Sequence, residues 1–226
     1  MQLQNNQRSV RARKLTATAM FCAMAYVCAI YLKIKIQFLT LDFKDSLIVL
    51  CSLLFGPVWG FSIAVTVPFL EFITVSDTGI YGFIMNALSS VTFSLVTGLI
   101  YRYKKSMLGA VIGLVSGVFA VTAVMVLANL FITPHFIGGT TADVAAMIPK
   151  LLLPFNLIKA ILNAAFVLLL YKPLSKILKK IGFVQSTRTD GAQAEKKSVW
   201  RTFVVTGIAI AVIIVSLLIL FLVIGK

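Results

Sequence analysis

Charged side chains are scarce in this sequence, and acidic ones are the scarcest. Only 12% of the 226 residues are charged, and seven of these are aspartate or glutamate. The chain has no HExxH, GxSxG or GxxxxGK motif, and its few carboxylates suggest no catalytic pair at a common depth. We therefore expect neither an enzyme, in the membrane or outside it, nor a pump that hydrolyses its own ATP.

Cysteine and histidine are also too rare to suggest a metal centre or a disulfide framework. Cys22, Cys28 and Cys51 lie in apolar segments without a CxxC spacing, which is typical of small core residues. The single histidine, His135, has no acidic or cysteine neighbour at ligand spacing. We expect it at the membrane–water interface and not at a metal site. The sequence predicts no metal site and no cofactor.

Apolar residues dominate the composition. They make up 60% of the chain, whose mean hydropathy is +1.01, whereas soluble domains are about half apolar. A membrane-spanning helix needs about 20 mostly apolar residues. Segments of this kind are Leu15–Leu32, Ser46–Phe55, Phe61–Val75, Ile80–Tyr101, Met107–Thr133, Leu152–Tyr171 and Val199–Ile224. The second and third are short, and "GPVWG" (residues 56–60) between them indicates a tight helix break.

This pattern predicts an all-α integral membrane protein, a six-helix bundle with one extra C-terminal transmembrane helix. The expected parts are a basic cytoplasmic N-terminus (1–14), the six-helix substrate-binding domain (15–181), a polar cytoplasmic linker (182–198) and the additional helix (199–226).

The net charge of +14 comes from basic residues beside the apolar segments. They cluster before the first segment, after the fourth, and between the sixth and seventh, which places them on one side if each segment crosses once. The positive-inside bias makes that side cytoplasmic, together with the N-terminus of a multi-pass protein of the cell membrane. We attribute these charges to orientation and contact with anionic lipid, and expect no nucleic acid partner.

Two connections are expected on the outer side. In residues 33–46, "KIKIQFLTLDFKDS", apolar and polar residues alternate as in an extended strand. This segment could fold back over the bundle as a lid, or rest its apolar side on lipid headgroups. The second connection is longer and runs through Pro134 and the paired glycines to Lys150.

Small residues recur at the spacing that lets membrane helices approach closely. Ala19 and Ala23 are four residues apart, as are Ala25 and Ala29, and residues 109, 113 and 117 are all glycine. Each stripe could pack inside the bundle or dock another membrane protein, and spacing alone does not decide between them.

Polar side chains interrupt the apolar segments at Glu71, Asn86, Asn129, Asn156, Lys159 and Asn163. On a helix the last three share one narrow face, because successive residues are about 100° apart. A lysine at the bilayer centre costs about 2.5–3.5 kcal/mol on insertion scales, so it usually faces a protein interior or a cavity.

These polar residues admit several readings. The asparagines could form hydrogen bonds between helices, and Glu71 and Lys159 could reach the outer headgroups. However, Asn129, Asn156 and Lys159 are expected at similar depth beneath the two outer connections. Together they could frame one pocket that opens outward.

Several stretches resemble the riboflavin-specific S components of energy-coupling factor (ECF) transporters. They are "FLTLDFKD" (38–45), "FGPVWG" (55–60) and above all "LPFNLIKAILN" (153–163), together with the alanine stripe of the first helix. The resemblance spans about residues 14–180. It implies a six-helix subunit, not an enzyme, that captures riboflavin as its transported ligand from outside. Its implied partners are a transmembrane coupling subunit and two cytoplasmic ATPase subunits.

The same resemblance assigns residues to these tasks. It implies substrate contacts by Asn129, Asn156 and Lys159, and docking of the coupling subunit on Ala19 and Ala23. The implied pocket is closed by the first loop at Thr40, Leu41, Asp42 and Phe43. We add Asn86 and Asn163 as further candidate binding residues, and we note that the seventh segment has no counterpart in the six-helix pattern.

Other functions stay open at this point. An S component for thiamine or for a flavin nucleotide is one, since Lys33, Lys35, Lys44 and Lys150 could supply external cations for a phosphate. A stand-alone proton-coupled transporter could use Glu71 as a relay, although the sequence shows no inverted repeat with broken helices. The third open alternative is a purely structural membrane protein.

Overall fold

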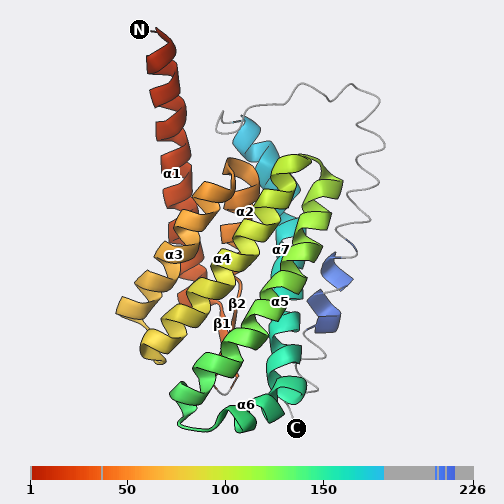
Figure 1. Cartoon of the computed structure of the whole chain (residues 1–226). Helices are drawn as coiled ribbons and strands as arrows, with labels where there is room; N and C mark the ends of the chain where they lie inside the picture. Colours follow the sequence, from red (N-terminus) through yellow and green to blue (C-terminus); the bar gives the residue numbers. More distant parts are fainter. Residues whose placement is uncertain (1, 37, 181–206, 208, 212, 217–226) are drawn as a thin grey trace.

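The computed structural model describes residues 2–36, 38–180, 207, 209–211 and 213–216, and these form a helical bundle around a small hairpin (Figure 1). The elements are α1 (Gln2–Tyr31), β1 (Lys33–Ile36), β2 (Leu39–Asp42), α2 (Lys44–Phe55), α3 (Pro57–Thr74), α4 (Gly79–Tyr103), α5 (Met107–Ile137), α6 (Thr141–Met147), the π-helical turn η1 (Ile148–Leu152) and α7 (Leu153–Lys180).

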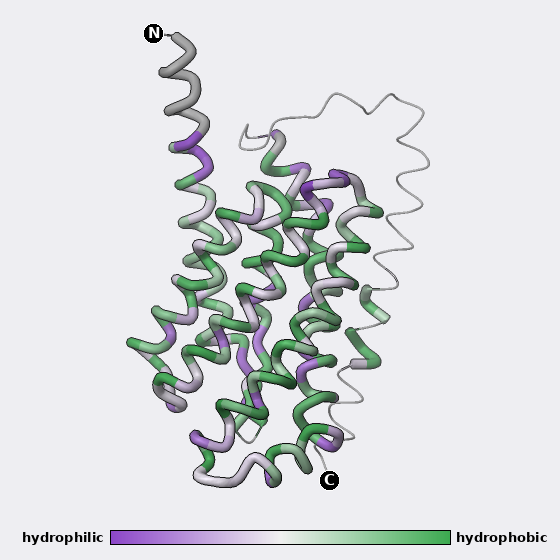
Figure 2. Tube along the Cα trace, viewed as in Figure 1, coloured by the Kyte–Doolittle hydropathy of each residue, from purple (hydrophilic) through white to green (hydrophobic). Residues whose placement is uncertain are grey.

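The first six predicted segments correspond to α1, α2, α3, α4, α5 and α7. Among the described residues, five helical stretches are long and apolar enough to cross a membrane, whereas α2 has only 12 residues. Figure 2 shows apolar residues along most of the length of these helices. The all-α membrane bundle is therefore confirmed. Helix α1 begins at Gln2, so most of the basic N-terminal segment (1–14) is helical and belongs to the first helix.

The seventh segment is described only in part. Residues 207, 209–211 and 213–216 are helical, and Ile213 packs against the apolar cluster formed by the hairpin and α7. The predicted linker (182–198) and the rest of the predicted final helix lie outside the described residues. The four domain boundaries stay predictions.

The predicted break between the second and third helices is a single residue. Gly56 has φ 110° and ψ 162°, a backbone conformation that side chains disfavour, and Pro57 begins α3 directly after it. The Gly56 N–H donates to the Ser52 carbonyl at 3.0 Å and so closes the end of α2. The chain therefore enters α3 without an intervening loop.

The glycine stripe of α5 serves internal packing. A Cβ atom on Gly117 would lie 2.4 Å from Thr97 Oγ1 and 2.8 Å from Phe93 Cδ2, both on α4. A Cβ atom on Gly113 would lie 2.9 Å from the Thr97 carbonyl oxygen. Only glycine lets α4 and α5 approach this closely.

The alanines of α1 divide between two faces. Ala25 and Ala29 are buried, so this pair packs inside the bundle. Ala19 and Ala23 are exposed on the surface of the described chain. Only the second pair is free for an external partner.

The connection between the first two helices is extended, as predicted, and it folds back into the bundle. Strands β1 and β2 pair antiparallel with Ile36 opposite Leu39. Ile36 and Leu41 are buried against Phe155 and Leu162 of α7. The hairpin therefore rests on protein and does not lie along a lipid surface.

The connection between α5 and α7 begins later and is more helical than expected. Helix α5 runs past Pro134 to Ile137 and ends at Gly138, whose φ of 69° is left-handed. Helix α6 follows almost at once, because Thr140 and Asp143 form a reciprocal capping box. The connection from α5 to α7 is still longer than the one from α1 to α2, as predicted, but it contains helical turns that the sequence analysis did not predict.

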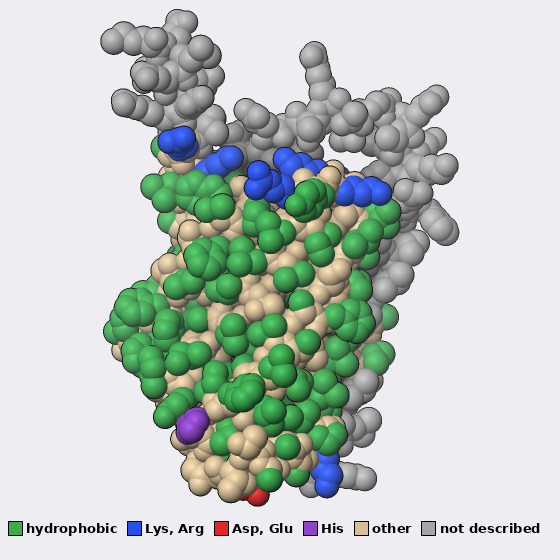
Figure 3. All heavy atoms as spheres, viewed as in Figure 1, with side chains coloured by type: hydrophobic (Ala, Val, Ile, Leu, Met, Phe, Trp, Pro, Cys, Tyr) green, Lys and Arg blue, Asp and Glu red, His purple; other side chains and the backbone are tan. Residues whose placement is uncertain are grey.

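Basic residues gather at one end of the bundle. Figure 3 shows lysine and arginine side chains at the end where α1 begins, above a broad band of apolar side chains. Exposed residues of this group include Arg11 and Arg13 on α1 and Arg102, Lys104 and Lys105 around the α4–α5 turn. Along the axis of the bundle, the surface thus changes from a basic end to a broad apolar band.

We expect Gly117→Val to lower stability by about 1–3 kcal/mol, because the added atoms would clash with Thr97 and Phe93. Thermal unfolding of the detergent-solubilised protein would measure the loss. Ala123→Val on the exposed face of the same helix is the matched control and should change little. Equal effects at both sites would contradict the packing role of the glycine.

Candidate functional site

The polar face of α7 turns toward the protein interior. The exposed fractions of Asn156, Lys159 and Asn163 are 7%, 8% and 1%. Lys159 does not extend toward headgroups, because its ammonium donates to the Thr40 carbonyl at 3.0 Å and to Asp42 Oδ2 at 2.9 Å. The predicted inward orientation of the three residues is confirmed.

A chain of alternating charges continues from Lys159 across the bundle. Asp42 Oδ2 lies 3.6 Å from the Lys44 ammonium, which donates to Glu71 Oε2 at 2.8 Å. Glu71 also accepts from Asn86 Nδ2 at 3.4 Å. The order Lys159, Asp42, Lys44, Glu71 links α7, the hairpin, α2 and α3 through opposite charges.

The inclusion of Lys44 among external cations for a phosphate was wrong. Its side chain is 1% exposed and its charge is matched by two carboxylates. A lysine in the first turn of a helix is unfavourable for the helix dipole, and this was the available sign of a specific partner. That partner, Glu71, is distant in sequence, so local pattern could not identify it.

Asp42 lies at the centre of this chain of charges. Burial by itself raises the pKa of the Asp42 carboxyl, but the ammonium groups of Lys159 and Lys44 hold that pKa below its usual value. Asp42 therefore acts as the anion that joins two lysines.

Asn163 joins the hairpin to two helices. Its Oδ1 accepts from the Ser46 N–H at 2.9 Å and from Ser46 Oγ at 2.6 Å, while its Nδ2 donates to the carbonyls of Asp42 and Lys159, both at 3.0 Å. The amide is thus fully used within the protein. Asn163 lies beside the hairpin base, outside the cavities described next.

A cavity of about 710 Å³, counted with its open mouth, lies between the hairpin, α4, α5 and α7. We call it the main cavity. Its polar lining brings together Thr40, Asn86, Asn129, Asn156 and Lys159 from the predicted set. Its apolar lining includes Phe38, Tyr81, Met85, Met125, Phe136 and Phe155.

The polar groups of the main cavity retain hydrogen-bonding capacity. Asn129 donates one N–H to the Met125 carbonyl and accepts from Thr133, and Asn156 donates one N–H to the Leu152 carbonyl. Each amide therefore keeps a second N–H, and Asn156 Oδ1 has no hydrogen bond among the described residues. Lys159 uses two of its three donors. Such a lining suits a flat apolar ligand with a polar edge.

Not every predicted residue lines the main cavity. The side chain of Leu41 in β2 is fully buried in the apolar cluster with Phe155 and Leu162. Phe43 packs on Phe166 with ring centroids 4.6 Å apart. Both residues therefore pack the hairpin and its C-terminal end against α7. Asp42 lines a second cavity.

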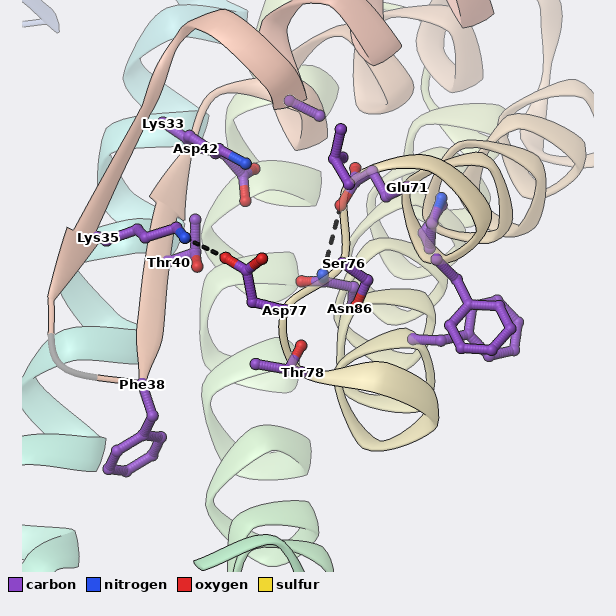
Figure 4. Close-up of a pocket in the computed structure, with 15 residues that line it drawn as sticks. Lys33, Lys35, Phe38, Thr40, Asp42, Glu71, Ser76, Asp77, Thr78 and Asn86 are labelled. Carbon is purple, nitrogen blue, oxygen red and sulfur yellow. Dashed lines mark hydrogen bonds and ion pairs between the residues drawn. The ribbon is translucent and has the colours of Figure 1, made fainter.

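The second cavity, which we call the side cavity, lies between the hairpin, α3 and the start of α4 and measures about 690 Å³ with its open mouth (Figure 4). Its charged lining is Lys33, Lys35, Asp42, Glu71 and Asp77. Lys35 forms an ion pair with Asp77 and so connects the hairpin to the α3–α4 turn. The hydrogen bond from Lys35 and its charge lower the pKa of the exposed Asp77 carboxyl. Sequence reasoning missed Asp77, which lies in a turn without a motif.

We expect Lys44→Met to destabilise the protein by about 3–5 kcal/mol, because it leaves Asp42 and Glu71 with less compensating charge in the interior. Lys33→Met, at a partly exposed lysine of the hairpin, is the control and should stay within about 0.5 kcal/mol. Unfolding curves of both variants in the same detergent would measure the two changes in stability. A Lys44 variant as stable as the Lys33 variant would refute a structural role for the buried charges.

Comparison with known proteins agrees with this geometry. The family model for "ECF transporter, substrate-specific component" matches residues 13–171. The protein is 30% identical over 179 residues to the riboflavin transporter RibU of Staphylococcus aureus (strain TCH60), covering 75% of this chain and 94% of that relative. A solved structure, described as "Structure and mechanism of the S component of a bacterial ECF transporter", superposes with a TM-score of 0.64 at 30% identity. It covers 75% of this chain and 99% of its own. The chain therefore belongs to the substrate-specific components of ECF transporters.

Proposed function

We propose that this S component captures riboflavin from outside the cell and presents it for uptake. The observation that carries the proposal is the main cavity, where Asn129, Asn156 and Lys159 face a wall of aromatic and methionine side chains. The relative named a riboflavin transporter supports the choice of ligand.

The chemistry of riboflavin fits these walls. Its ring system is flat and largely apolar, and one edge carries carbonyl oxygens on either side of an N–H. An asparagine amide can donate to such a carbonyl and accept from such an N–H, and a lysine can donate to a carbonyl or hydroxyl oxygen. Tyr81, Phe136 and Phe155 can cover the rings. The ligand would complete hydrogen bonds that the cavity leaves open.

The distribution of basic residues supports an outward-facing cavity. Arg11, Arg13 and the lysines of the α4–α5 turn lie at the end of the bundle away from the hairpin tip (Figures 1 and 3). The positive-inside bias assigns that end, with the N-terminus, to the cytoplasm. The hairpin and the cavity mouths then lie on the outer side of this multi-pass membrane protein.

Capture needs no chemistry from this subunit. In the proposal it works without a cofactor and is not an enzyme, and ATP hydrolysis by two cytoplasmic ATPase subunits drives uptake. A transmembrane coupling subunit would dock on the exposed pair Ala19 and Ala23, where small side chains permit close helix contact.

We expect Asn156→Ala to weaken riboflavin binding by about 1–3 kcal/mol, because a buried polar group of the ligand would lose its partner. Lys159→Ala should weaken binding further, because it also removes the ion pair with Asp42 that holds the hairpin. Quenching of flavin fluorescence on titration measures the affinity. Lys150→Ala, on the exposed turn before α7, is the control and should bind like wild type. Failure of the wild-type protein to bind riboflavin would refute the substrate assignment.

We expect Ala19→Trp and Ala23→Trp to abolish ATP-driven riboflavin uptake while leaving binding to the isolated subunit unchanged. The reason is steric, since an indole at either position holds a partner helix away. Ala123→Trp, on an exposed face of α5, is the matched control. Uptake into vesicles that contain the coupling and ATPase subunits is the measurement. Normal uptake by both α1 variants would exclude this docking face.

A further inference from the structure

The seventh predicted segment has one buried face. Its described residues 207, 209–211 and 213–216 are helical, and we call them the seventh helix. Ala209 and Ser216 are 2% and 7% exposed, and Ile213 is partly buried. At about 100° per residue, these three side chains lie within about 60° of one another. The remaining described residues of the helix are exposed, namely Gly207, Ile210, Ala211, Ile214 and Val215. The seventh helix therefore contacts the rest of the protein along one narrow stripe, which we call the contact stripe (Ala209, Ile213 and Ser216).

The contact stripe lies against the hairpin and α7. Ile213 packs against an apolar cluster that contains Ile36 and Leu41 of the hairpin and Phe155 and Leu162 of α7. Each of these four side chains is at most 5% exposed. Figure 1 shows the described helical pieces of this segment, in blue, alongside the bundle. The seventh helix thus lies over a surface to which the hairpin and α7 both contribute.

The hairpin separates polar from apolar side chains, because successive residues of a strand point to opposite faces. Lys35 of β1 and Thr40 of β2 line the cavities. Ile36 and Leu41, which follow them in the chain, lie in the apolar cluster instead. None of the described residues of the seventh helix lines either cavity. The seventh helix therefore lies behind the cavity wall that the hairpin forms, on its apolar side.

The composition of the contact stripe suits close packing inside a membrane. Hydrophobic burial is weak between helices in lipid, so their association depends on close contact and is favoured by small residues. Alanine and serine occupy two of the three stripe positions, and isoleucine supplies the side chain that reaches the apolar cluster. The contact stripe therefore gives the hairpin a packing partner in addition to α7.

We infer that the seventh helix is a brace, which holds the apolar face of the hairpin against α7 and slows outward displacement of this cavity wall. The ion pair between Asp42 and Lys159 fastens the polar side of the hairpin, and the brace fastens the opposite side. On the proposed function, the brace lengthens the time for which riboflavin stays bound. It leaves the proposed docking face open, because Ala19 and Ala23 are exposed in the same chain.

Two matched pairs of substitutions in the full-length chain test the brace. Ala209→Trp places an indole in the contact stripe, and Ala211→Trp makes the same change on the exposed face of the helix. Ile213→Ser removes the contact with the apolar cluster, and Ile214→Ser is its control at the neighbouring exposed position. Two quantities are measured in lipid nanodiscs. They are hydrogen–deuterium exchange of the backbone amides of β1 and β2 without flavin, and the rate of riboflavin dissociation.

Ala209→Trp and Ile213→Ser should each accelerate amide exchange in the hairpin and riboflavin dissociation about tenfold, because both processes require the hairpin to open. Ala211→Trp and Ile214→Ser should match wild type in both measurements. If Ala209→Trp does not fold, Ile213→Ser and its control supply the comparison.

The outcomes separate this inference from the proposed function. Unchanged hairpin exchange in both stripe variants overturns the brace, as does an equal effect of the two controls. Faster exchange without faster riboflavin release overturns its role in retaining the ligand. A stripe that instead joins two copies of the chain would show as loss of a dimer with unchanged hairpin exchange, which also overturns the brace. Wild-type protein that binds no flavin refutes the proposed function, and hairpin exchange still decides whether the brace exists.

Discussion

The ion pair between Asp42 and Lys159 is the contact on which the arrangement of this protein depends. It fastens the end of β2 to the middle of the polar face of α7, within hydrogen-bonding distance at 2.9 Å. The hairpin forms one wall of both cavities, so their shape follows from this contact. Lys44 and Glu71 extend the same pairing to α2 and α3, so that each of these four charges lies beside an opposite one.

Much of the bundle could be predicted because its determinants are local. The length of each apolar run predicted its helix, and the helical repeat correctly placed Asn156, Lys159 and Asn163 on an inward face. Alternation in residues 33–46 predicted an extended segment. Each of these features is encoded within a single helix or strand.

The unpredicted features depend on contacts between residues far apart in sequence. Lys44 was assigned to the outside because nothing near it shows that Glu71 will meet it across the bundle. The same holds for Lys35 and Asp77 and for Asn163, whose hydrogen bonds go to Ser46 and Asp42. The helical turn from Thr141 onward was missed for a different reason, since Pro134 and the two glycines look like a loop when they mark helix ends.

The shortness of α2 has a consequence for how a membrane protein makes room for a solute. At about 1.5 Å per residue, its 12 residues reach about 18 Å, against a hydrocarbon core of about 30 Å. The hairpin packs beside this short helix, and Lys159 and Asn163 of α7 donate to the carbonyls of Thr40 and Asp42 in its second strand. A short helix beside a folded-back hairpin thus leaves a recess in the bundle, lined by polar side chains that the longer helices supply.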